Sequence, residues 1–372
     1  MRWDAQKLTE ELATGPPGLF RLPSLVRSVQ TPEFDGMTFH EVLARTVLNQ
    51  VPLTSRMLPG AWTINPYRGC SHACLYCYAR STHRYLDLDA GADFDTQIVV
   101  KVNVAEVLAR ELATKKVLPD SVALGTNTDP YQRAEGRYRL MPGIIGALRE
   151  AGVALSILTK GTLLRRDLAL LAEVSETQPV SPAMSIAIFD DASQQSLEPG
   201  TPTTAARLAT VRMVRDAGMG CAVFIAPVIP GLTDSTEQLD RALDLIEAAG
   251  ATSVRYTALR LGPHVKELFL AWLAQEHPEL LPRYRELYGQ GSHTPGSYRR
   301  LLDTRMGVLR RRHGLHDGAA SAARAGEKER STAGRFSLNR FGPGTASGRP
   351  RRSPAASDSP PGGMGKEQPL LF

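Results

Sequence analysis

Between residues 120 and 276, short apolar stretches alternate with segments in which apolar residues recur every three or four positions. Short apolar stretches bounded by turn residues are typical of buried strands, and the recurring pattern is typical of helices that bury one face. Strands are predicted, in chain order, at 121–126, 153–160, 183–190, 220–229 and 252–261. Helices are predicted at 141–152, 163–174, 202–219, 234–250 and 265–276, the fourth with Asp234 or Ser235 as its N-cap.

This alternation predicts a parallel sheet, because parallel strands are joined by crossover connections that usually contain a helix. These crossovers are nearly always right-handed. A further strand near 62–65 brings the number of β-α units to about six. We therefore expect an α/β fold, a partial (β/α)6-type TIM barrel with a core at 61–262. In such folds ligands bind at the C-terminal ends of the strands.

The flanks of this core have other patterns. Residues 1–60 are expected to form an N-terminal extension packed on the barrel, and within it the apolar stripe of 38–49 predicts a helix. Residues 263–316 are predicted to form a C-terminal helical segment. Residues 317–372 are rich in Gly, Ala, Ser, Pro and Arg, and we expect a disordered basic tail because few large apolar residues are available for burial.

Composition and charge narrow the function classes. No window approaches the ~20 apolar residues of a membrane span, and the start is too polar for a signal peptide, so we expect a cytoplasmic protein. The net charge is +6, but 318–372 holds nine basic and four acidic residues, or +5, which leaves +1 for the rest. The tail could bind a phosphate backbone or merely remain soluble, and composition leaves both open.

Three of the four cysteines lie in NPYRGCSHACLYCYAR, residues 65–80, at Cys70, Cys74 and Cys77. This clustering favours metal or redox chemistry over disulfides. Three thiolates are one short of a tetrahedral site. Zinc could add His72 or His83, whereas a [4Fe-4S] cluster could leave its fourth iron open. Cys221 lies in an apolar stretch, which is typical of a small core residue.

The CxxxCxxC spacing, with the aromatic Tyr76 before the third cysteine, resembles the radical S-adenosylmethionine (SAM) superfamily. The segments LGTNTDPYQRAEGRYRL, LTKGTLLRRDL, LEPGTPTTAARL and IAPVIPGLTD resemble its spore photoproduct lyase-related branch, often labelled "DNA repair photolyase", over about residues 35–300. The resemblance favours a [4Fe-4S] cluster on the three cysteines and implies a barrel of the radical SAM kind. It also implies that SAM binds the open iron and is cleaved to a 5′-deoxyadenosyl radical, with an electron donor such as ferredoxin or flavodoxin.

The resemblance further implies which residues surround SAM. Tyr76 and Tyr78 would lie along the adenine, and Asn127 and Thr128 would bind the amino group. Lys160, at the end of a strand, would suit the carboxylate, although such lysines are often simply solvated.

Other polar residues near the strand ends are candidates for the site. Ser185 faces the barrel interior if strand alternation runs that way. Glu198 and Arg207 could form an ion pair that closes the pocket. Asp129 and Tyr131 are candidate catalytic residues that meet the substrate, Tyr131 as a relay of a hydrogen atom.

One departure from the branch concerns the reaction. Spore photoproduct lyase donates hydrogen from a cysteine on the strand after the cluster, and the matching SVALGTNTDP has none. We therefore expect a related radical reaction on a different substrate, with DNA repair or nucleic-acid modification favoured. A protein or small-molecule substrate is the alternative. The near-neutral charge outside the tail favours it, since a face that binds duplex nucleic acid should be basic. A zinc module without enzymatic activity is the third hypothesis.

The chain ends in QPLLF. Gln368, Leu371 and Phe372 resemble the peptide by which bacterial DNA repair proteins bind the replication sliding clamp, although Pro369 replaces the more usual leucine. An apolar anchor on a flexible tail suits such a contact. The alternative is an arbitrary apolar terminus.

Overall fold

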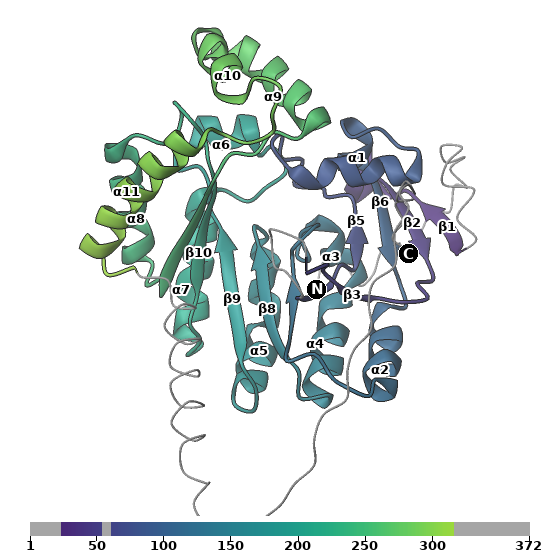
Figure 1. Cartoon of the computed structure of the whole chain (residues 1–372). Helices are drawn as coiled ribbons and strands as arrows, with labels where there is room; N and C mark the ends of the chain where they lie inside the picture. The colour runs from purple at the N-terminus through teal and green to yellow at the C-terminus, as the bar shows by residue number, and fades with distance from the viewer. Residues whose placement is uncertain (1–23, 54–60, 316–372) are drawn as a thin grey trace, which may run out of the picture. The chain divides into compact units, whose positions relative to one another are not determined.

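Six parallel strands form the centre of the protein, side by side in chain order (Figure 1). They are β4 (Trp62–Ile64), β7 (Ser121–Leu124), β8 (Ala154–Thr159), β9 (Val180–Ser185), β10 (Ala222–Val228) and β11 (Ser253–Ala258). In this computed structural model, which describes residues 24–53 and 61–315, β3 (Leu48–Gln50) pairs antiparallel with β4. β3 and β11 form the two edges of the sheet. The predicted α/β fold with a partial barrel is confirmed.

Helices on the crossovers cover the outer face of this sheet (Figure 1). They are α4 (Leu140–Glu150), α5 (Leu168–Ser175), α7 (Thr204–Asp216) and α8 (Thr236–Ala248), and α2 (Val104–Thr114) packs on α4. Shorter helical segments precede or follow the strand ends: α3 (Arg133–Tyr138), η4 (Thr162–Asp167) and α6 (Asp191–Leu197). The predicted N-cap Ser235 forms a capping box with Gln238, which satisfies free backbone N–H groups at the start of α8.

The two faces of β8 differ in burial. On the helix-facing side, Leu155 and Ile157 of β8 are fully buried in the main core. Their neighbours Ser156 and Leu158 point to the opposite face and are half-buried. The in-register partners of Ser156 and Leu158 are small, namely Ala123, Ser181 and Ala183. The apolar runs suggest strands buried on both faces, but the interior face of β8 is only partly buried, and its in-register neighbours there are small.

A second sheet of four strands was not foreseen. Its order is β1 (Leu25–Val29), β2 (Thr38–Val42), β6 (Gln97–Lys101) and β5 (Tyr67–Arg68). The predicted helix over 38–49 is therefore wrong, because residues 38–42 pair with β6 and 48–50 pair with β4. The buried His40 shows the cause, since its ring nitrogens reach Ser28 and Gln97 at 2.7 and 2.8 Å across the sheet. Pairing between distant segments overrides the local apolar stripe.

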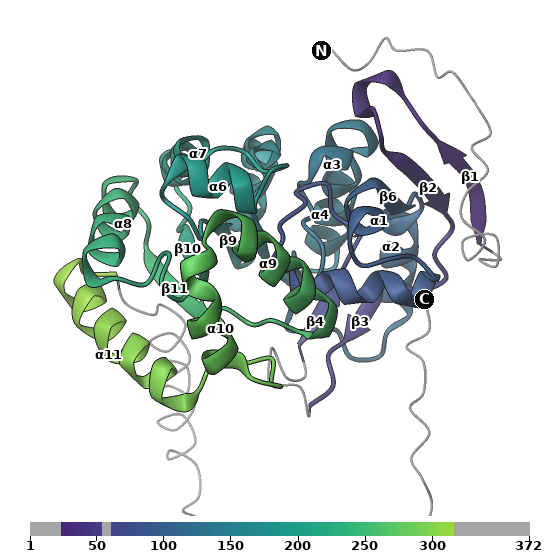
Figure 2. The same cartoon turned by 90° about the horizontal axis from the view of Figure 1, so that it is seen from above.

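The remaining elements lie beside or after the barrel strands: η2 (Pro32–Phe34), η3 (Tyr78–Leu86), α1 (Ala92–Thr96), α9 (Pro263–Glu276), η5 (Pro278–Leu280), α10 (Leu281–Tyr288) and α11 (Gly296–Arg312). α11 packs against α8 and β11, and α9 packs against η3. Figure 2 shows α1, α6 and α9 from above, at the end of the barrel to which the strand arrows point in Figure 1.

Contacts divide the chain into Met1–Asp317 and Gly318–Phe372, and every described residue belongs to the first unit. The predicted disordered tail and its terminal motif lie outside the described residues, as do residues 1–23 of the N-terminal extension. Within 24–53 and 61–315, no helix combines the length and apolar character that a membrane span requires.

Candidate functional site

The cysteine loop follows β5 and winds through three consecutive turns. The backbone N–H groups of Ala73, Cys77 and Arg80 donate to the carbonyls of Cys70, Cys74 and Cys77 at 3.2, 3.2 and 3.3 Å. Ala73 adopts a left-handed conformation with φ 54°. Cys70 and Cys74 are buried and Cys77 is half-buried. Burial and the nearby Cys70 raise the pKa of Cys77 to about 11. The thiols therefore lie close enough together to affect one another.

The donor set fits an iron-sulfur cluster. Neighbouring buried thiolates repel each other, and bound metal supplies the compensating positive charge. In the part of the chain that the structure describes, no group of three or more His, Cys, Asp or Glu side chains has the arrangement of a site for a single metal ion. His83 uses Nε2 on the carbonyl of Gln97 at 2.9 Å, and His72 faces Asp129. Both histidines thus contact protein groups, and three thiolates without a fourth protein ligand are the set that a cluster with one open iron uses.

Gln132 holds the backbone on both sides of Cys70. Its Nε2 donates to the carbonyl of Gly69 at 3.0 Å, and its Oε1 accepts from the N–H of Ser71 at 2.9 Å. The side chain is fully buried, so water cannot replace these bonds. The sequence analysis did not identify Gln132. Its position after Asp129 and Tyr131 in a polar stretch was the available signal.

The segment after α6 holds the loop from another side. Leu75 N–H donates to the carbonyl of Leu197 at 3.0 Å, and Gly200 N–H donates to that of His72 at 3.1 Å. A Cβ at Gly200 would lie 2.0 Å from the carbonyl oxygen of Ser71. Glycine is therefore required at position 200, because any side chain would displace the cysteine loop.

Asp129 joins the ends of β7 and β8 to the loop. Oδ1 accepts from Tyr131 N–H at 2.8 Å and from the Thr159 hydroxyl at 2.5 Å, while Oδ2 accepts from Lys160 N–H at 2.6 Å. Nδ1 of His72 lies 3.3 Å from Oδ2. Burial would raise the pKa of Asp129, but His72 and these hydrogen bonds outweigh it and lower the pKa. Both oxygens are occupied, so the geometry supports a structural role and not the predicted contact with substrate.

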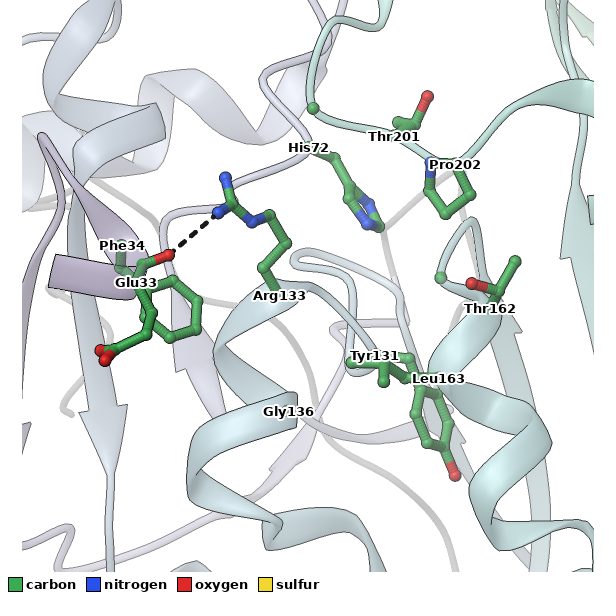
Figure 3. A pocket seen from close by; sticks show the side chains of 12 residues that line it. Glu33, Phe34, His72, Tyr131, Arg133, Gly136, Thr162, Leu163, Thr201 and Pro202 are labelled. Carbon is green, nitrogen blue, oxygen red and sulfur yellow. Dashed lines mark hydrogen bonds between the residues drawn. The ribbon is translucent and has the colours of Figure 1, made fainter. Parts of the chain in front are cut away.

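Tyr131 is directed away from the cysteine loop. Its ring is buried in the main core, and Figure 3 shows it pointing away from His72. Burial and the neighbouring Asp167 raise its pKa. This position gives no support to the predicted relay of a hydrogen atom.

A buried charged cluster lies beside Cys74. Arg207 donates to Glu198 at 2.6 Å, both with no solvent exposure, so the expected ion pair is formed. Lys160 Nζ lies 3.2 Å from Glu198 and donates to Ser185 Oγ at 2.8 Å, and the Tyr76 hydroxyl donates to Glu198. Burial would raise the pKa of Glu198, but Lys160 and Arg207 outweigh it and lower the pKa to about 2. Four residues predicted from separate segments, Tyr76, Lys160, Ser185 and Glu198, are thus in mutual contact.

The other predicted cofactor contacts lie around the end of β7. Tyr78 is half-exposed, and its hydroxyl donates to the carbonyl of Thr126. Thr128 is buried and donates to the carbonyl of Tyr67 at 2.9 Å. Asn127 is half-buried, and its amide has no hydrogen-bond partner among residues 24–53 and 61–315. Of the two amino-group candidates, Asn127 is the one whose side chain is available.

A cavity of about 300 Å³ lies against the loop at His72. Figure 3 shows His72 and Arg133 among the residues that line it, with the Arg133 guanidinium directed to the carbonyl of Glu33 at 3.4 Å. Phe34, Thr162 and Thr201 also line it, and no residue of the interior face of the sheet does. The cavity therefore adjoins the loop without belonging to the barrel interior.

Comparisons with known proteins agree with this geometry. The family model described as "Radical SAM superfamily" matches residues 64–245. The uncharacterized protein Rv2578c of Mycobacterium tuberculosis is 57% identical over 293 residues, which cover 79% of this chain and 86% of that protein.

Among solved structures, a mutant of spore photoproduct lyase superposes with a TM-score of 0.55 at 16% identity, over 74% of this chain and 79% of that one. Spore photoproduct lyase complexed with dinucleoside spore photoproduct superposes with a TM-score of 0.53 at 15% identity, over the same shares of the two chains. At these identities the likeness establishes the fold.

Proposed function

Because this chain belongs to the radical SAM superfamily, we propose that Cys70, Cys74 and Cys77 hold a [4Fe-4S] cluster with one iron free of protein ligands. With SAM bound there, the cluster supplies reductive cleavage to methionine and a 5′-deoxyadenosyl radical that abstracts hydrogen from a substrate. The observation that carries this proposal is the set of three neighbouring thiols, two buried and one half-buried, beside the Glu198 charged cluster.

The chain's own residues would bind and orient SAM. The Lys160 ammonium is close enough to Cys74 and Cys77 to favour their thiolates, and we assign it to the SAM carboxylate together with Ser185. Glu198, itself paired with Arg207, holds the half-buried Lys160 in place, since a lysine shielded from water needs a partner. We assign Tyr76 and Tyr78 to the adenine.

Asn127 takes the amino group in this proposal, since its amide is free among the described residues. Thr128 keeps its hydroxyl on Tyr67 and supports the same loop.

For the substrate we favour a nucleic acid, in DNA repair or nucleic-acid modification. The fold shared with spore photoproduct lyase and the basic composition of 318–372 support this proposal. No cysteine stands in SVALGTNTDP, so we propose a reaction other than spore photoproduct reversal. The charge of +1 outside the tail supports the alternative of a protein or small-molecule substrate.

Two partners belong to this proposal. A ferredoxin or flavodoxin would deliver the electron for SAM cleavage. Gln368, Leu371 and Phe372 would bind the sliding clamp, and loss of a tail peptide's clamp binding on Phe372→Ala would test that contact.

The central test is anaerobic purification followed by iron and sulfide analysis and by detection of 5′-deoxyadenosine after reduction with dithionite. Alanine at Cys70, Cys74 or Cys77 should abolish both cluster and product. Cys221→Ala, a buried cysteine of the main core, is the matched control and should retain both. A zinc-loaded protein without iron, or product formation in a Cys70→Ala variant, would refute the proposal.

A further inference from the structure

Exposed aromatic side chains gather on one segment. Within 24–53 and 61–315, the large apolar side chains that stand exposed include two aromatic ones, Tyr78 at 39% and Tyr85 at 75%. Both belong to η3, which begins directly after the third cysteine of the loop. An exposed tyrosine ring offers a flat apolar face that the protein itself leaves uncovered.

η3 connects two distant parts of the barrel end. At its start, the Tyr78 hydroxyl bonds to Thr126, just after β7. Near its end, Arg84 Nη1 lies 2.5 Å from Nε2 of His264, in the first turn of α9, which follows β11. η3 therefore lies along the mouth of the barrel, with its exposed rings beside the cysteine loop.

Cationic groups accompany these rings. Arg84 is exposed beside Tyr85, and the exposed Arg260 lies in the connection between β11 and α9, just before the His264 that Arg84 contacts. Among the acidic groups that follow η3, Asp87 is exposed, whereas Asp89 and Asp93 are directed to the backbone, since Asp89 Oδ2 and Asp93 Oδ2 accept from each other's N–H groups at 3.2 and 3.0 Å. We call Tyr78, Arg84, Tyr85, Arg260 and His264 the tyrosine–arginine rim.

Resting on the nucleic-acid substrate proposed above, we propose that this rim binds single-stranded nucleic acid. Tyr85 stacks on an unpaired base, and Arg84 and Arg260 contact neighbouring phosphates. Stacking on an open aromatic face needs a base that is not paired within a duplex, and arginines beside the ring supply the charge for the backbone. The rim thereby brings a strand to the edge of the cysteine loop, where the proposed radical chemistry occurs.

The test is fluorescence anisotropy with the full-length, cluster-loaded protein and a labelled single-stranded 12-mer, with its duplex as competitor. Tyr85→Ala should weaken binding about tenfold and Tyr85→Phe should restore it, because one stacked base contributes roughly that factor or more. Arg260→Ala should lower the slope of log affinity against log salt by about 1. Arg149→Ala, an exposed arginine at the opposite end of the sheet, is the matched control and should change neither quantity.

The basic tail is present in every variant, so differences among them report the rim. Equal affinity of wild type and Tyr85→Ala, a preference for the duplex, or no binding by the wild type overturns the inference. 5′-Deoxyadenosine formation without oligonucleotide is measured on the same samples. If 5′-deoxyadenosine still forms while oligonucleotide binding fails, only the rim is refuted. If cluster-loaded wild type forms no 5′-deoxyadenosine, the proposed SAM cleavage itself is refuted.

Discussion

At the scale of single residues, the cysteine loop depends on side chains that are not ligands. Gln132 satisfies one peptide donor and one peptide acceptor on either side of Cys70, and Asp129 accepts three hydrogen bonds from two strand ends. These bonds fix where the thiols lie before any metal arrives. Ligand spacing alone would leave the loop free to adopt many conformations.

Replacing Gln132 with glutamate should therefore impair the loop more than the fold. The carboxylate still accepts from Ser71 but cannot donate to the carbonyl of Gly69, which is left buried and unpaired at a cost of about 1–3 kcal/mol. We expect a lower iron content per chain after reconstitution. Gln178→Glu is the control, because buried Gln178 also donates to backbone carbonyls, those of Leu148 and Val153. Equal iron loading in both variants would contradict this role of Gln132.

Glu198 makes stability depend on pH at the acid end. Its pKa is lowered to about 2, so its ion pairs stabilise the folded state fully above the unfolded pKa of about 4.3 and are lost as pH falls toward 2. The lowered pKa of Glu198 corresponds to a contribution of about 3 kcal/mol to the free energy of unfolding at pH 7. Glu198→Gln should be less stable than wild type at pH 7, since it leaves the buried Arg207 and the half-buried Lys160 without their carboxylate partner.

Urea unfolding of both proteins between pH 7 and pH 3.5 measures this difference. It should stay constant down to about pH 4.5 and then shrink, because wild type loses the contribution that the variant lacks. A difference that grows on acidification would rule out the assigned ion pairs.

At the scale of elements, β8 buries its outward-facing apolar residues in the main core and leaves its inward-facing ones partly exposed. Ile157 is buried in the main core, while the adjacent Ser156 lies half-exposed on the interior face in register with Ala123. The alternation is visible in ALSILT, yet an apolar run alone does not show which face is filled.

This asymmetry predicts opposite responses from neighbouring positions. Ile157→Ala should lower the free energy of unfolding by about 2–5 kcal/mol, because it leaves a cavity in a packed core. Ser156→Leu should change it by less than about 1 kcal/mol, because the interior has room for the added side chain. Chemical denaturation measures both, and a large loss in Ser156→Leu would mean that the interior is packed.

At the scale of the whole molecule, local patterns predicted the barrel well and its additions poorly. The β-α alternation and the N-cap Ser235 follow from short-range signals, and these elements are confirmed. The strand at 38–42 exists because β1 and β6 lie on either side of it, and the apolar stripe of 38–49 does not reveal either pairing. In the site, the ligand spacing and the pair Glu198–Arg207 could be read from the sequence. Gly200 could not, and Gln132 could be noticed only as a polar residue after Asp129 and Tyr131, since the importance of both arises where separate loops meet.

The C-terminal helices share one apolar cluster with the cysteine loop. Cys74 and Tyr76 belong to the same buried cluster as Phe269 and Trp272 of α9 and Tyr284 of α10. The Phe269 ring packs on those of Trp272 and Tyr284 at centroid distances of 5.3 and 5.5 Å. α9 and α10 therefore shield one side of the loop from water, although they lie nearly 200 residues away in sequence.

Phe269→Ala should consequently do more than destabilise the fold. The substitution should lower the free energy of unfolding by about 3–5 kcal/mol, and it should also open a path for water and oxygen toward Cys74. We expect the iron-sulfur absorbance of the reconstituted variant to decay several-fold faster in air than that of wild type. Leu243→Ala, in the main core on α8, is the control, because it should cost about 2–5 kcal/mol without exposing the loop. Equal decay rates in the two variants would show that global stability, and not the cover of α9 and α10, protects the cluster.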